Sequence, residues 1–164
     1  MGITCTLVGH SERRSLYAET DSLLIKKTVY CLNKDMKVVF CCGEQLADRE
    51  SNNTEQVIKT QIESLKALDT SSWKNLVIAY EPVWAIGTGK VASPEQAQEA
   101  HRFIRQWVTE NVSEAVAQQV RIIYGGSVKE ANCQNLIKMQ DIDGFLIGGA
   151  SLKASFAEIV KMSS

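Results

Sequence analysis

The chain has 164 residues, of which 45% are hydrophobic and 23% charged, and its formal net charge is −1. That length is enough for one domain with a sizeable core, and the composition is ordinary for a soluble globular protein. The small net charge gives no electrostatic argument for a nucleic-acid or membrane partner, and no apolar run is long enough to cross a bilayer. We therefore expect a single domain over residues 1–164.

The N-terminal segment and the cysteines bear on cellular location. Met1 is not followed by a basic region and a long hydrophobic stretch, so no signal peptide is predicted. The five cysteines are odd in number and include no Cys-x-x-Cys pair, which favours reduced thiols in a cytoplasmic protein. Residues 1–6, MGITCT, also fit the loose N-myristoylation template; the competing interpretation is that a buried strand begins there.

In chain order, short apolar runs rich in β-branched residues alternate with longer amphipathic stretches. Two of the runs, KVVFCC and NLVIAY, are almost continuously apolar, as expected for strands that are covered on both faces. Cys41 and Cys42 are adjacent in one run, so a strand should turn them to opposite faces. The runs predict five strands, at Cys5–Val8, Lys37–Cys42, Asn75–Tyr80, Arg121–Tyr124 and Gly144–Ile147.

Helical periodicity fills the intervals between those runs. Apolar residues recur every three or four positions over residues 57–68 and again over residues 97–108. The second helix has a clear start signal, in which Ser93 caps, Pro94 takes the first helical position and Gln96 completes a capping box.

A last helix, from about Ser155 to Met162, is expected to bury Phe156, Ile159 and Val160. Strands that alternate with helices imply βαβ units and a parallel sheet. The sequence contains no linker, repeat period or low-complexity segment. The chain is therefore predicted to be an α/β domain of about five β-then-α units.

Polar or glycine-rich sequence follows each predicted strand at its C-terminal end. Parallel α/β folds build their sites at that edge of the sheet, so these segments together indicate an enzyme. His10 and Glu81 are the natural acid/base candidates, because apolar neighbours can raise a carboxyl pKa and a helix N-terminus keeps a histidine neutral. The alternatives are a structural histidine and a salt-bridged glutamate, and His101, inside a predicted helix, is assigned a structural role.

The loops after the last two predicted strands carry glycine pairs, in Gly125-Gly126-Ser127 and in Gly148-Gly149. Glycines let backbone N–H groups approach an oxyanion, and barrel enzymes commonly bind phosphate with these two loops, although tight turns also explain such pairs. Gly87-Thr88-Gly89-Lys90 lacks the spacing of a nucleotide-binding loop. Its glycines and Pro82 instead predict hinges on either side of a lid with the apolar tip VWAI.

These segments resemble the signature segments of the triosephosphate isomerase family, in that family's order and at its spacing. They are GHSERR at 9–14, CCGE at 41–44, YEPVWAIGTGK at 80–90, YGGS at 124–127 and GFLIGGASL at 144–152. The resemblance covers essentially the whole chain and implies a partial (β/α)8 TIM barrel, whose five units resemble the family's fourth to eighth. It also implies a homodimeric isomerase of glycolysis and gluconeogenesis that interconverts dihydroxyacetone phosphate and D-glyceraldehyde 3-phosphate with no cofactor or metal.

The resemblance further implies individual roles. Glu81 resembles the general base, His10 the neutral electrophile that polarises the carbonyl, and Glu12 a second carboxylate near the site. Pro82 to Lys90 resembles the loop that closes over substrate, for which this family is the standard example. The implied donors around the phosphate are Gly87, Ser127, Gly148 and Gly149.

The chain departs from the family in length, because a complete barrel takes about 250 residues and three opening βα units are expected to be absent. With them would go a substrate-contacting asparagine and lysine, and a long loop that reaches the partner subunit. Losing one such electrostatic group typically costs orders of magnitude in rate. Five parallel strands cannot close the barrel, so open edges and an apolar face predict self-association.

Two further interpretations stand beside the isomerase. One is a catalytically silent barrel fragment that acts as an oligomeric or interaction module, as the missing lysine loop and the open edges suggest. The other is a different phosphate-binding barrel enzyme that shares the last two loops, against which the GHSERR and lid segments argue.

Overall fold

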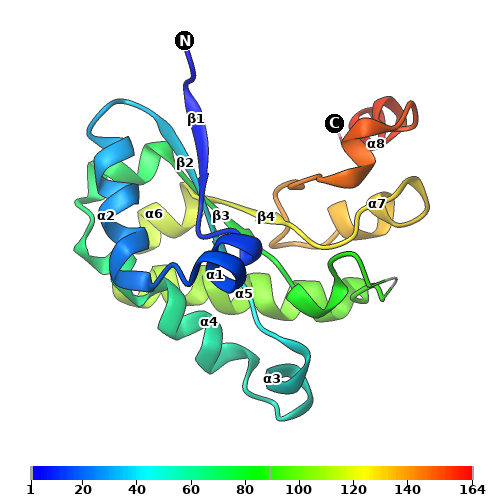
Figure 1. Ribbon diagram of the computed structural model, residues 1–164, viewed down its shortest axis with the longest axis horizontal. Coiled ribbons are helices and arrows are strands. Elements are labelled where there is room, and N and C mark those ends of the chain that lie inside the picture. Colours follow the sequence, from blue (N-terminus) through cyan, green and yellow to red (C-terminus); the bar gives the residue numbers. More distant parts are fainter. Residues whose placement is uncertain (1, 89, 164) are drawn as a thin grey trace.

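The computed structural model describes residues 2–88 and 90–163, and in this part of the chain helices pack against one face of a parallel sheet (Figure 1). The sheet has four strands in the order β1-β2-β3-β4, and every neighbouring pair is parallel. The strands are β1 (Cys5–Val8), β2 (Lys37–Cys42), β3 (Leu76–Tyr80) and β4 (Arg121–Tyr124). The α/β prediction and the first four predicted strands are thereby confirmed. Met1 of the MGITCT pattern lies outside the described residues.

The connections between strands are helical, as the periodicity predicted. The α-helices are α1 (Ser11–Tyr17), α2 (Asp21–Leu32), α3 (Leu46–Glu50), α4 (Thr54–Ile62), α5 (Pro94–Asn111), α6 (Glu114–Gln119), α7 (Glu130–Ile137) and α8 (Phe156–Met162). Short 3-10 helices are η1 (Glu63–Ala67), η2 (Thr70–Asn75), η3 (Val83–Ala85) and η4 (Gly149–Leu152). No helix in the described ranges is long and apolar enough to cross a membrane.

The prediction of a fifth strand over Gly144–Ile147 is wrong in extent, because this segment forms only an isolated parallel bridge between Tyr124 and Phe145. Two backbone bonds make the bridge, from Tyr124 N–H to Gly144 C=O at 2.9 Å and from Leu146 N–H to Tyr124 C=O at 2.9 Å. The Asp143 carboxylate accepts the Ile122 N–H at 2.7 Å, so a side chain stands where a paired strand would offer a backbone carbonyl.

The two faces of the sheet are packed differently. One face carries Val38, Phe40, Cys42, Ile78, Tyr80, Ile122 and Tyr124, which join the main core with residues of the helices. The other face carries a small separate cluster of Val39, Cys41 and Ala79, against which Val77, Ile123 and Leu146 pack. Cys41 and Cys42 fall in different clusters, which confirms that they point to opposite faces. Leu7, which pairs with Val39 in register, is 47% exposed, so this second face lies open at β1.

The helix that begins at Pro94 starts as the sequence predicted. The Ser93 hydroxyl accepts the Gln96 N–H at 3.2 Å, and the Gln96 side chain accepts the Ser93 N–H at 2.9 Å. This capping box satisfies two N–H groups that the first turn leaves without partners. At the other end of the chain, α8 buries Ile159 completely, whereas the prediction of a buried Val160 is wrong because that side chain is on the outer side and exposed.

A polar cluster fastens the C-terminal lobe, α7 and α8, to the rest of the molecule through the turn before Gly144. The Asp141 carboxylate accepts from Arg105 Nε at 2.7 Å and from the Gln98 amide at 2.6 Å, both on α5. His101, also on α5, is fully buried, and its Nδ1 lies 3.1 Å from the Asp141 carbonyl. Its pKa is lowered to about 4 because burial disfavours the charged ring. His101 has the structural setting that its helical context predicted.

Candidate active site

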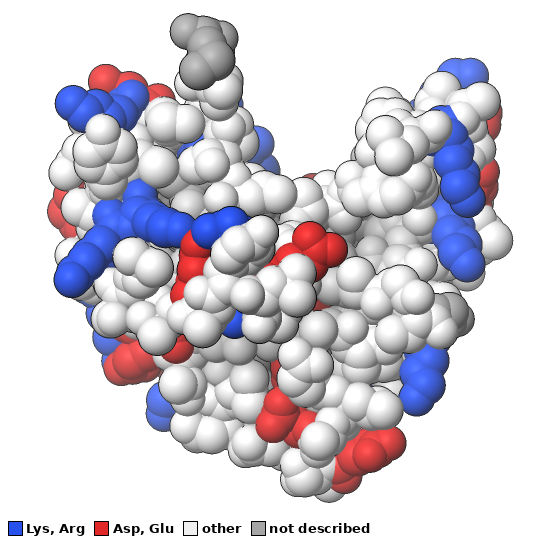
Figure 2. Space-filling view, viewed as in Figure 1, with Lys and Arg blue, Asp and Glu red and all other residues white. Residues whose placement is uncertain are grey.

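A cavity of about 430 Å³ lies at the C-terminal ends of the strands, between the sheet and the C-terminal lobe. Figure 2 shows the hollow between the end of β1 and the lobe of α7 and α8. Its lining includes six residues that the sequence placed in the site, and these are His10, Glu81, Gly87, Ser127, Gly148 and Gly149. One cavity therefore receives segments that are far apart in the chain, and His10 and Gly149, for example, are 139 positions apart.

The His10 and Glu81 side chains meet in this cavity, with His10 Nε2 3.0 Å from Glu81 Oε1. Glu81 directly follows β3, and its N–H donates to the Cys42 carbonyl of β2 at 2.7 Å. Its second carboxylate oxygen accepts the Ser11 N–H at 3.0 Å. The carboxylate is thus held from both sides, with Oε1 turned toward the imidazole.

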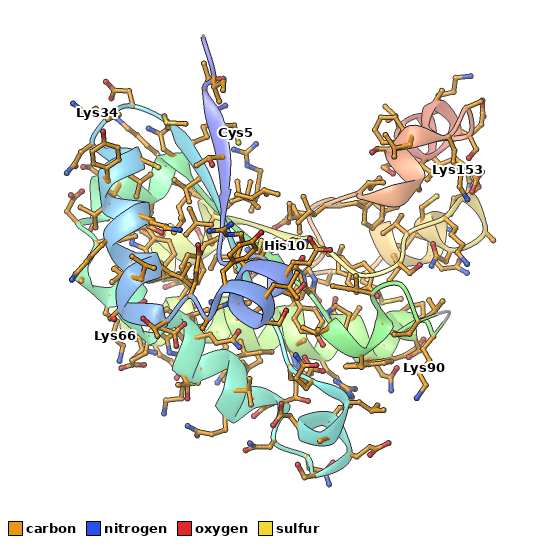
Figure 3. All side chains as sticks on the ribbon, viewed as in Figure 1. Cys5, His10, Lys34, Lys66, Lys90 and Lys153 are labelled. Carbon is orange, nitrogen blue, oxygen red and sulfur yellow. The ribbon has the colours of Figure 1, made fainter. Side chains whose placement is uncertain are left out.

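His10 is the N-cap of α1, and its Nδ1 accepts the Glu12 N–H at 3.3 Å. An acceptor Nδ1 carries no proton in the neutral ring, so the proton of that tautomer is on Nε2, the nitrogen that faces Glu81. Figure 3 shows His10 next to α1, at the bottom of the hollow. The helix start therefore fixes both the position of the ring and the atom that can donate.

Glu81 is 2% exposed, and burial raises the pKa of its carboxyl group above the ordinary value. The nearby His10 and the Ser11 N–H oppose this shift, because both stabilise the ionised form. A buried carboxylate with a raised pKa is a stronger base than an exposed one, which suits proton abstraction near neutral pH.

The other end of the cavity is lined by the loops that precede α7 and η4. Ser127 lies in the loop after β4, where its carbonyl accepts from the Asn132 amide at 2.9 Å. Gly148 precedes η4 and Gly149 begins it. A Cβ built on either glycine would meet no other atom within 4 Å, so the backbone is open to an approaching ligand. This end offers N–H groups and a hydroxyl, the donors that an oxyanion requires.

Glu12 is placed differently from the other predicted site residues. Its side chain is exposed and is absent from the cavity lining, while its backbone N–H holds His10. Its charge contributes to the raised pKa of Glu81 as the weakest of the named causes. A direct role for this carboxylate stays a prediction.

The predicted lid begins at a buried anchor that the sequence analysis did not assign. Glu44, from the CCGE segment, is fully buried and accepts from Tyr80 Oη at 3.0 Å and from Trp84 Nε1 at 2.9 Å. Trp84 belongs to η3, so this carboxylate ties the start of the lid to β3. Gly87 is exposed with φ +69°, a left-handed conformation that favours glycine. Gly89, the other predicted hinge glycine, lies outside the described residues.

Two lysines in the lining were also missed, Lys129 and Lys153. The only sequence signal for them is distance along the chain, since each follows one of the glycine-containing loops by two to four residues. The described residues contain no group of three or more His, Cys, Asp or Glu side chains that could hold a metal ion.

Comparison with known proteins gives the family. The family model described as Triosephosphate isomerase matches residues 1–163. The chain belongs to the triosephosphate isomerase family. It is 52% identical over 162 residues to a triosephosphate isomerase of Dictyostelium discoideum, which matches 98% of this chain. It is 50% identical over 160 residues to that of Neurospora crassa and 52% identical over 159 residues to that of Emericella nidulans, which match 98% and 96% of this chain.

The chain spans 63% to 64% of the length of these curated relatives. The family assignment and the parallel α/β architecture together agree with part of a TIM barrel. In the described residues, β1 and β4 are the outer strands of the sheet, and the barrel is not closed.

Proposed function

We propose that this chain is an isomerase that interconverts dihydroxyacetone phosphate and D-glyceraldehyde 3-phosphate by proton transfer through an enediolate. The observation that carries the proposal is the 3.0 Å approach of His10 Nε2 to Glu81 Oε1 in a cavity whose far end is lined by Ser127, Gly148 and Gly149. A triose phosphate is a short molecule with a carbonyl near one end and a phosphoryl group at the other. The cavity offers acid/base groups and anion donors in the same arrangement.

The geometry suggests how the reaction proceeds. Substrate enters between His10 and Glu81, and its carbonyl oxygen takes the place of Glu81 Oε1 as the acceptor of the Nε2 proton. Glu81 removes a proton from the carbon beside the carbonyl, and the electron pair moves to form the enediolate. His10 stabilises the negative oxygen, and the hydroxyl proton passes from the neighbouring oxygen to this one. Glu81 returns the carbon-bound proton to the adjacent carbon, where the new carbonyl then lies beside it, so no atom is gained or lost.

The finer assignments belong to this proposal. Glu81 acts as base, His10 as electrophile, and Glu12 as an acidic neighbour. The N–H groups of Gly87, Gly148 and Gly149 and the hydroxyl of Ser127 bind the phosphoryl group. Residues 82–90 form the lid, which the Trp84–Glu44 hydrogen bond anchors.

We also infer that residues 1–164 form one incomplete barrel domain, because a single core cluster extends from Val8 of β1 to Ile159 of α8. A cytoplasmic homodimer is part of the proposal. Leu16 and Tyr17 on α1 are large exposed side chains, which suits an additional protein contact.

The test is a coupled isomerase assay on the purified chain and three variants. Glu81→Asp keeps the charge but withdraws the carboxylate by one methylene, which should cost about 100-fold in kcat because near-attack geometry is lost. Glu81→Gln removes the base and should cost about 100- to 10,000-fold. Glu50→Gln, on the exposed end of α3, is the matched control and should leave the rate unchanged.

Background turnover that Glu81→Asp does not alter would contradict the proposal. That result, together with a well-behaved assembly in size-exclusion chromatography, would favour the silent fragment, an alternative that the family assignment does not support.

A further inference from the structure

The two lysines in the cavity lining lie on the C-terminal lobe, next to the proposed phosphate donors. Lys129 is the N-cap of α7 and stands two residues after Ser127, and its backbone N–H donates to the Asn132 side chain at 2.8 Å. Lys153 follows η4, the 3-10 helix that Gly149 begins. Figure 3 shows Lys153 on the lobe of α7 and α8, across the hollow from His10. Both lysines therefore belong to the end of the cavity opposite the acid/base pair.

Neither ammonium group forms an ion pair with a carboxylate of the described residues. Within residues 2–88 and 90–163, no carboxylate lies within 4.0 Å of Lys129 Nζ or Lys153 Nζ. By contrast, Lys66 pairs with Glu63 at 2.6 Å and Lys161 with Glu158 at 3.2 Å. The pKa of the neighbouring Glu130 is lowered mainly by the Ser155 hydroxyl, and the charges of Lys153 and Lys129 contribute less. Both lysines thus line the cavity without a carboxylate within ion-pair distance in the described residues.

The cavity consequently has a charge gradient along its length. Its acid/base end holds the Glu81 carboxylate, and its other end holds two cations beside open backbone N–H groups. A phosphate monoester carries nearly two negative charges at neutral pH, so the carboxylate repels it and the lysines attract it. The gradient favours the orientation in which the carbonyl end of a short phosphorylated substrate reaches Glu81.

We propose that Lys129 and Lys153 capture the phosphoryl group of the substrate and orient it at the basic end of the cavity. The proposal rests on the proposed isomerase function and adds two positioning residues to it. Both side chains are exposed, and the phosphoryl group does not react, so their attraction is the same in the ground state and in the transition state. Such uniform binding changes KM and leaves kcat unaltered.

The first experiment measures binding without turnover. sn-Glycerol 3-phosphate, which has no carbonyl to isomerise, is titrated calorimetrically into the full chain and into Lys129→Gln, Lys153→Gln and the double variant. Exposed ion pairs contribute modestly, so each single variant should bind about threefold more weakly and the double variant about tenfold more weakly at low salt. The differences should shrink as salt is added, because exposed charges are screened.

Lys138→Gln is the matched control, because Lys138 is an exposed lysine at the opposite end of α7 and is absent from the cavity lining. Circular dichroism checks that all variants fold alike. Equal affinity of the double variant and the unmodified chain would overturn the proposal, and so would an equal loss in Lys138→Gln or an absence of any binding by the unmodified chain.

The second experiment separates this proposal from the isomerase itself. In the coupled assay the double variant should show a KM about tenfold higher and an unchanged kcat. Lysine-dependent binding without turnover would refute the isomerase and leave the capture role intact. Turnover in which the double variant loses kcat at constant KM would refute the capture role and leave the isomerase intact.

Discussion

The two ends of the cavity are built in different ways. At the acid/base end, Glu81 directly follows a central strand, and the backbone of β2 and the start of α1 both hold it. At the phosphate end, Gly148 and Gly149 follow a segment that joins the sheet by one bridge. A methyl group on Gly43 would overlap the backbone of Glu81, whereas one on Gly148 would meet nothing within 4 Å.

This difference corresponds to what the proposed reaction requires of each end. Proton transfer depends on the separation of two side-chain atoms, so small displacements are costly. A phosphoryl group has several equivalent oxygens and a large charge, so it is recognised by several donors together and tolerates adjustment. The proposed acid/base pair accordingly lies directly after β3 and at the start of α1, and the proposed anion site lies in loops. The predictions below test this division, beginning with the largest expected effect.

The acid/base end should give the largest loss for a single side chain. His10→Gln keeps a polar group at the N-cap but removes the ring nitrogen that faces Glu81. We expect kcat to fall about 100- to 1,000-fold, as for the loss of one donor to a developing oxyanion, with KM nearly unchanged. The coupled isomerase assay measures both constants. A change in KM alone would assign His10 to substrate binding and would contradict the proposed difference between the two ends of the cavity.

If the acid/base end is rigid, one added methyl group there should destabilise the fold. Gly43→Ala forces apart β2 and the Glu81 backbone, and we expect it to destabilise the fold by about 1–3 kcal/mol, which is typical of overpacking. Gly148→Ala is the counterpart at the phosphate end and should stay within about 0.5 kcal/mol. Urea unfolding followed by circular dichroism compares the two. Equal losses would show that both ends are equally constrained.

A smaller effect is expected for the hydroxyl at the phosphate end. Ser127→Ala removes one of several donors and should raise KM about tenfold, within the range for one hydrogen bond to a charged group. The rate constant kcat should remain within a factor of two or so, because the phosphoryl group does not react. A KM equal to that of the unmodified chain would remove Ser127 from the anion site.

The smallest effect concerns stability and pH. Burial raises the pKa of Glu81, so folding favours its protonated form, and the stability associated with this group is lost as pH rises through the raised pKa. Glu81→Gln cannot ionise and should therefore be more stable than the unmodified chain at neutral pH. The advantage should disappear below the ordinary glutamate pKa of 4.5. Urea midpoints at several pH values test this, and a variant that is less stable at neutral pH would contradict it.

The sequence predicted the acid/base end more completely than the phosphate end. β2 and β3 have continuous apolar runs, and the capping box at Ser93 is a local signal that needs no tertiary contact. The segment 144–147 has the same apolar character but forms one bridge, because a strand needs partners that its own sequence does not specify. Nothing in the sequence distinguishes Lys129 and Lys153 from other surface lysines, and only the structure places them in the cavity lining.

What the sequence determined by itself was the order of strands and helices, the residues at the strand ends, and the family, because periodicity, capping and motifs are local properties of the chain. The tertiary structure decided which atoms meet: the 3.0 Å approach of His10 to Glu81 and the opposite placement of two lysines. It also decided which face of the sheet is covered, since β2 is apolar on both faces and only the helices select one. The physical reason is that distances between residues 71 positions apart, such as His10 and Glu81, are set by packing of the whole sheet and by no local preference.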